Sequence, residues 1–161
     1  MPALTIELKK GRNGPTSLAC VRADGSRTWA RVHPFLPIHD LNHCAVESVL
    51  GFTEAFWGLV AGGWELDDFA SPGAAGRLPP QALWAEHLVG LIERKVASNA
   101  NGLNEALAAS LPEGLRQGAP IVTEEDLEAI ERLRTRLKTR WESTPAGGTL
   151  RVGFPANRAG V

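Results

Sequence analysis

The N-terminal third of the chain alternates apolar and polar residues, and this pattern limits the possible folds more than any other. In the stretch LTIELK at residues 4–9, every second residue is apolar. The segment SLACVRADGSRTWARV holds two further runs around Asp24-Gly25, a pair that tolerates the positive φ angles of a tight hairpin turn. Because a period of two is typical of strands, we predict an antiparallel sheet, which the stretch TLRVGF near the C-terminus joins.

Helical spacing replaces this alternation after the proline-containing stretch HPFLP, where Pro37 suits the first turn of a helix. The strongest helical signal comes later, where Thr123 and Asp126 form a capping-box pattern ahead of apolar residues that recur on one face. We predict helices at residues 38–50, 56–61 (capped by Thr53), 81–98 and 123–141, with one or two further turns at 103–110.

Residues 64–80 contain three prolines and two glycines and show no period, so we expect a long irregular loop that could act as a lid. The whole pattern predicts an α+β fold in which a small antiparallel sheet, made of the N-terminal strands and the C-terminal strand, packs against a helical layer. With 161 residues, the chain is expected to form a single domain over residues 1–161.

The charge balance excludes two large classes of binding protein. Lys and Arg number 17 against 18 Asp and Glu, whereas general nucleic-acid and membrane-surface binders need a basic excess. The N-terminal stretch MPALTIELKK does not resemble a signal peptide, and the two cysteines, Cys20 and Cys44, do not suggest a disulfide framework. We therefore expect a cytoplasmic protein.

The stretch IHDLNHCAVE places His39 and His43 four residues apart, so that both rings lie on one face of a helix. Two imidazoles at this spacing can share one tetrahedral ion, for which zinc is the best match. A third ligand must come from elsewhere. Glu47 lies on the same stripe, although the rise of about 12 Å from His39 is long for one ion. His87 is the preferred outside ligand and the adjacent Glu86 is the next choice.

Asp40 occupies the position of the catalytic glutamate in the H-E-x-x-H signature of zinc peptidases, so it is a candidate base that activates a metal-bound water, with Glu47 as the alternative. The interaction of an acid with the N-terminal end of a helix explains Asp40 almost equally well. Similarly, His39, His43 and Glu47 could form a hydrogen-bonded polar seam inside a helical interface. Both alternatives stay open at the level of sequence.

The segment HDLNHCAVESVLGFTEAFWGLVAGGWELDD resembles a family of small bacterial proteins with the pattern H-D-L-x-H-x-x-x-E, then Gly-Trp, then a Glu-His helix. The resemblance covers residues 25–95 and implies no particular activity. The likeness to zinc peptidases is weaker, because Asp replaces Glu and no Gly-x-x-His follows the second histidine. The positions that match the pattern of the bacterial family are His39, Asp40, His43, Glu47, Trp64, Glu86 and His87.

These observations predict a protein that binds a divalent metal, most simply zinc, and that could be a hydrolase acting through a metal-activated water. The alternative is a non-enzymatic structural or interaction domain with a hydrogen-bonded histidine seam. A small-molecule ligand or self-association is the expected form of partner, and neither nucleic acid nor membrane is expected.

Overall fold

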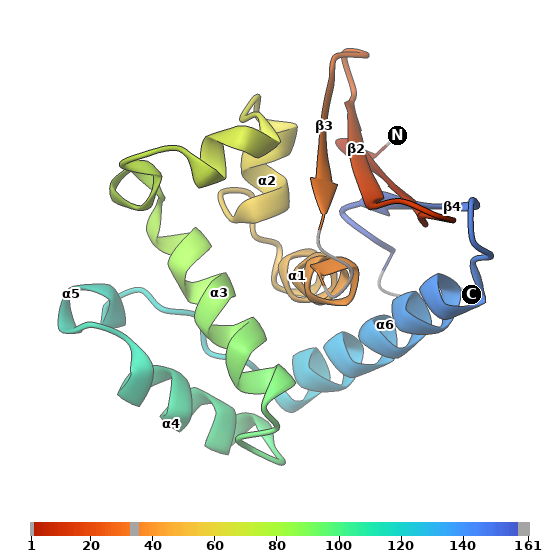
Figure 1. The fold of residues 1–161 in the computed structure, drawn as a ribbon. Helices are drawn as coiled ribbons and strands as arrows, with labels where there is room; N and C mark the ends of the chain where they lie inside the picture. The colour runs from red at the N-terminus through yellow and green to blue at the C-terminus, as the bar shows by residue number, and fades with distance from the viewer. Residues whose placement is uncertain (1, 33–35, 158–161) are drawn as a thin grey trace.

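The alternating segments form a four-stranded antiparallel sheet in the computed structural model, which describes residues 2–32 and 36–157 (Figure 1). The strand order is β3-β2-β1-β4. The C-terminal strand joins the sheet, as the sequence predicts, and pairs with β1. The strands are β1 Leu4–Lys9, β2 Thr16–Arg22, β3 Arg27–Val32 and β4 Thr149–Phe154.

One face of the sheet is the floor of the core. Ile6 pairs with Cys20 on β2 and with Val152 on β4, and all three side chains are buried. Residues that alternate with the buried ones along each strand, such as Glu7, face the other side of the sheet. The alternation seen in the sequence is therefore the alternation of a buried and a solvated face, which confirms the predicted α+β architecture.

The helix α1, Leu36–Leu50, lies at the centre of the molecule. Figure 1 looks nearly along its axis, with the sheet on one side, α3 on the other and α6 alongside. It begins two residues earlier than predicted, and Pro37 lies in its first turn. It ends at Gly51, whose φ of 68° is in the left-handed region that favours glycine.

The segment after α1 corrects two predictions. The short helix α2, Phe56–Ala61, begins after Ala55 rather than after a Thr53 cap, because the backbone N–H groups of Thr53 and Glu54 donate to Gln81 Oε1 instead. The region predicted as an irregular loop contains two 3₁₀ turns, η1 Leu66–Ala70 and η2 Ala74–Arg77. Such short turns carry no periodic signal that a sequence pattern could reveal.

The remaining helices pack around α1 and α3. The helix α3, Pro80–Glu93, ends five residues earlier than predicted, since Lys95 takes a φ of 54° that ends it. The helix α6, Glu124–Ser143, has the predicted capping box between Thr123 and Asp126. Between them lie α4, Ala100–Ser110, which is longer than expected, and α5, Glu113–Arg116. Across residues 2–32 and 36–157, every helix is too short or too polar for a membrane-spanning segment.

Candidate metal centre

His39 and His43 lie one turn apart on α1 and face α3. Their ring centroids are 4.8 Å apart and the rings meet edge to face. His43 is buried, with 5% of its side chain exposed, whereas 29% of His39 is exposed. The pair therefore spans the boundary between the core and the solvent.

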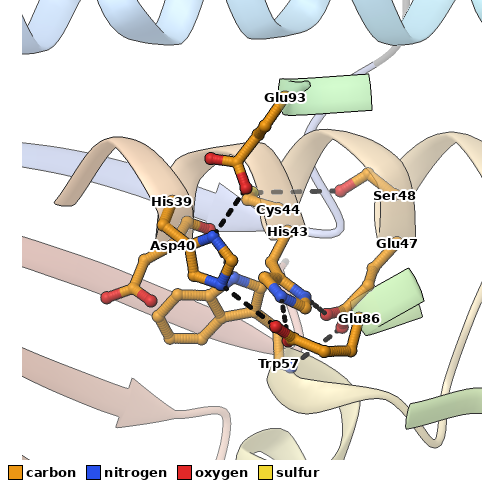
Figure 2. A network of polar contacts seen from close by, with 9 residues as sticks. All are labelled: His39, Asp40, His43, Cys44, Glu47, Ser48, Trp57, Glu86 and Glu93. Atoms are coloured by element: carbon orange, nitrogen blue, oxygen red, sulfur yellow. Dashed lines mark hydrogen bonds and ion pairs between the residues drawn. The ribbon is translucent and has the colours of Figure 1, made fainter. Parts of the chain in front are cut away.

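The carboxylate of Glu86, on α3, lies against both rings (Figure 2). Glu86 Oε2 is 2.8 Å from Nε2 of His43, and Oε1 is 3.6 Å from Nε2 of His39. One ligand atom from each of the three residues lies within 4.8 Å of the others. Ligands about 2.0–2.2 Å from a tetrahedral ion lie roughly 3.3–3.6 Å apart, so small shifts would let the three residues hold one ion.

Two further carboxylates hold the rings from behind. Nδ1 of His39 is 2.8 Å from Oε1 of Glu93, and Nδ1 of His43 is 3.1 Å from Oε2 of Glu47. A carboxylate at Nδ1 favours the proton there and fixes the plane of the ring. Both Nε2 atoms are consequently the ones that face Glu86 and the space between the helices.

Glu47 is part of this network but lies on the Nδ1 side of His43. Its carboxylate is fully buried, and its second oxygen, Oε1, accepts a hydrogen bond from the backbone N–H of Trp57 at 2.9 Å. Glu47 therefore fixes the Nδ1 side of the His43 ring, as a member of a hydrogen-bonded seam would. The structure does not bring Glu47 into the group formed by His39, His43 and Glu86.

His87 points away from the pair. Its Nδ1 is 3.1 Å from Oγ of Ser110 on α4, on another side of α3 from Glu86. One residue along a helix corresponds to a rotation of about 100°, so α3 can present only one of these two neighbours to α1. The sequence favoured His87 over Glu86 as the outside residue that meets the histidine pair. In the structure Glu86 meets the pair instead.

The surrounding carboxylates set the charge state of the metal-free site. Burial alone lowers the pKa of His43, but Glu47 and Glu86 together outweigh burial and raise it to about 9. Glu86 likewise raises the pKa of His39, burial lowers it, and Glu93 adds to the increase. The same contacts hold the pKa of Glu86 well below its usual range.

Asp40 lies beside the histidines but not between them. In Figure 2 its carboxylate projects past His39, on the side away from Glu86. Burial raises its pKa to about 6, and His43 and His39 oppose that shift. Asp40 is the fifth residue of α1 and lies outside the first turn, so the helix dipole explains this acid less well than the sequence suggested.

These polar groups form the floor of a cavity of about 350 Å³. The wall is apolar and comes from α2, η1, the residue that follows η2 and the beginning of α3. Because 61% of the Glu86 side chain is exposed, the cavity opens to solvent beside this residue. The lining residues are His39, Asp40, His43, Phe56, Phe69, Leu78, Ala82, Leu83 and Glu86.

Sequence reasoning missed Glu93. It lies seven residues after Glu86, two turns along the same face of α3. This spacing is the signal that could have shown that both acids face the same neighbour. Its Oε2 also accepts a hydrogen bond from Nδ2 of Asn42 at 3.1 Å, and Asn42 Oδ1 accepts one from Nε of Arg134 on α6. The orientation of His39 is thus tied to three helices.

Within the described ranges, the group of His39, His43 and Glu86 alone brings three His, Cys, Asp or Glu ligands close enough for one ion. Cys44, although it follows His43, is fully buried, and its sulfur lies 4.0 Å from Oγ of Ser48. Burial raises the pKa of this thiol to about 12, so it is not disposed to act as a thiolate ligand. Comparisons with protein-family models, curated proteins and solved structures match no family, protein or structure to this chain.

Proposed function

We propose that the protein binds one divalent metal ion, most simply zinc, through Nε2 of His39, Nε2 of His43 and the carboxylate of Glu86. The observation that carries the proposal is the direction of the rings. Both Nε2 atoms face Glu86 while Glu93 and Glu47 hold both Nδ1 atoms. Carboxylate-held histidines of this kind are typical of metal ligands in proteins.

Three protein ligands leave at least one coordination position for water or a ligand, as catalytic zinc sites do. That position would face the cavity, because the three ligands form part of its floor. We therefore propose a metal-dependent hydrolase in which the ion lowers the pKa of a bound water. Asp40 lines the same cavity and is the proposed base.

A second function is supported by one specific observation. Every ring nitrogen of His39 and His43 already lies within 3.6 Å of a carboxylate oxygen without any metal. A complete set of partners is also what a purely structural hydrogen-bonded seam requires. In that case the protein would be a non-enzymatic interaction domain. The proposals of a cytoplasmic location and of membership in the bacterial family with the H-D-L-x-H-x-x-x-E pattern apply to either function.

Metal analysis of protein purified without a histidine tag separates the two functions. The metal proposal expects about one zinc per chain, or one iron, since two histidines and a carboxylate also suit non-haem Fe(II). Glu86→Gln and His39→Ala should both lose the metal with the fold retained, because neither side chain is fully buried. His87→Ala, one position further along α3, is the matched control and should keep it.

The opposite result is equally clear. Protein that is isolated without metal, and whose melting temperature stays the same when zinc, iron or manganese is added, would leave the hydrogen-bonded seam as the function of these residues. Retention of the metal in both Glu86→Gln and His39→Ala would show that the ion binds elsewhere.

A further inference from the structure

The cavity next to the candidate metal centre has two chemically distinct parts. Its floor is polar and acidic, with Asp40 and Glu86 beside the two histidines. Its wall is entirely apolar and is formed by Phe56, Phe69, Leu78, Ala82 and Leu83. At about 350 Å³ it is at the lower end of the ~300–1,000 Å³ typical of small-molecule sites. Since an apolar cavity of about 150 Å³ can hold benzene, this cavity has room for a ring together with its substituents.

No lysine or arginine is present among the described residues that line the cavity. Two arginines that contact neighbouring segments, Arg77 and Arg22, are already engaged. Arg77 lies over the ring of Trp64 and donates to Ser71, while Arg22 donates to the carbonyl oxygens of Val60 and Trp64. An anionic group on the part of a ligand that lies against the apolar wall would therefore be buried beside apolar carbon without a cationic partner, an unfavourable arrangement.

The aromatic part of the wall is held in place by other rings. Phe56 lies 4.5 Å from Phe69 and 4.6 Å from Trp57, and Phe69 lies 5.0 Å from Trp64, measured between ring centroids. Arg22, on β2, fixes the chain between α2 and η1 through hydrogen bonds of 2.7 and 2.6 Å. The wall is consequently preorganised, which favours rigid apolar groups over flexible ones.

We infer that the ligand of this site is a small molecule with an aromatic or branched apolar body, without an anionic group on that body, and with an oxygen donor that reaches the metal. The inference rests on the proposed metal site and adds the class of substrate. The apolar body lies against Phe56 and Phe69, and the oxygen donor lies among His39, His43 and Glu86. For a hydrolase, this arrangement favours uncharged esters or amides of apolar acids over phosphate esters.

The test uses three hydroxamic acids that share one metal-binding group, titrated into zinc-loaded protein by calorimetry. Benzohydroxamic acid should bind about 10–100-fold more tightly than acetohydroxamic acid, because burial of the ring removes its apolar surface from water. The third, 4-carboxybenzohydroxamic acid, adds a charge to the same ring and should lose at least about tenfold relative to benzohydroxamic acid.

A cavity-filling variant locates the effect. Ala82→Phe places a ring inside the cavity and should abolish the advantage of benzohydroxamic acid, with zinc still bound. Ala109→Phe adds the same side chain at an exposed position on α4 and should leave that advantage unchanged.

Equal affinities for the benzo and aceto compounds, or an advantage that survives Ala82→Phe, would overturn this inference while the metal proposal stands. Equal binding of the carboxylated ring would refute the assignment of charge. If zinc does not bind, none of the three compounds will bind, and the metal proposal and the inference fail together.

Discussion

The two flanks of α1 are both buried, yet they are built in opposite ways. The flank that faces α3 and the cavity carries His43 and Glu47, whose polar atoms all have partners. The flank that faces the end of β4 carries Leu41 and Cys44, and there Ser48 accepts a hydrogen bond from the backbone N–H of Ala156. One flank is thus held by charge-assisted hydrogen bonds and the other mainly by the packing of apolar side chains.

The difference between the two flanks bears on the proposed metal site. Apolar side chains of similar volume can replace a buried ion pair with little loss of stability, and sometimes with a gain. A buried histidine between two carboxylates is therefore a poor way to fill space in a helical interface. Its presence on one flank of α1 therefore supports the proposal of a metal site there.

The largest effect is expected from removal of the centre of the polar flank. His43→Ala leaves the carboxylate of Glu47 buried and without its cationic partner, which should lower the free energy of unfolding by about 3–5 kcal/mol. Urea denaturation in the presence of a chelator measures this loss. The variant should also show no increase in melting temperature when zinc is added.

The matched control makes the polar flank resemble the apolar one. His43→Leu combined with Glu47→Leu removes both charges and should recover most of the lost stability, still without a response to zinc. A loss below about 1 kcal/mol in His43→Ala would contradict this account, because it would mean that Glu47 does not depend on His43.

A smaller and simpler loss is expected on the apolar flank. Leu41, which is 2% exposed, packs in the core, so Leu41→Ala should cost about 2–4 kcal/mol through the cavity that it leaves. In contrast to His43→Ala, this variant should keep the full zinc response, measured as the increase in melting temperature. Loss of that response would show that packing on one flank controls the geometry of the other.

The sequence predicted the sheet and the histidine pair because both depend on local patterns. Alternation assigns the faces of β1 and β2 directly, and a spacing of four places His39 and His43 together on any helix. The position of Glu86 depends instead on how α3 rotates about its axis. That helix is apolar over most of its surface, so its sequence does not indicate which residue faces α1.

Contacts distant in sequence decided what local patterns could not. Ser110 on α4 binds the ring of His87 and thereby leaves Glu86 to face the histidines. The acceptor role of Glu47 depends on the backbone of Trp57, ten residues away. Neither contact produces a periodic pattern in the sequence. The third residue beside the histidine pair was therefore harder to predict than the fold.

The polar flank should also make the metal-free protein sensitive to pH. The pKa of His43 is about 9 in the folded protein against an ordinary value of 6.5, so the folded state binds the proton more tightly than the unfolded state. The resulting stabilisation is complete below pH 6.5 and is lost as the pH rises through 9. We expect the melting temperature in a chelator to fall on the order of 5 °C over this range.

Zinc should reverse the trend, because the metal binds the neutral ring and its affinity increases as the proton leaves. The double variant with Leu at positions 43 and 47 should show a flatter profile than the natural protein in the chelator. A profile of the same steepness would assign the pH dependence to groups other than His43.

The smallest effect tests the carboxylate behind the more exposed histidine. Glu93→Gln keeps the size of the side chain but weakens the acceptor for the Nδ1 proton of His39, so zinc affinity should fall about tenfold, or ~1.4 kcal/mol. Competition with a fluorescent zinc chelator measures this change. Glu142→Gln, which alters an exposed carboxylate that pairs with Lys138 on the same helix instead, should leave the affinity unchanged. Equal affinities in both variants would mean that His39 keeps its orientation without Glu93.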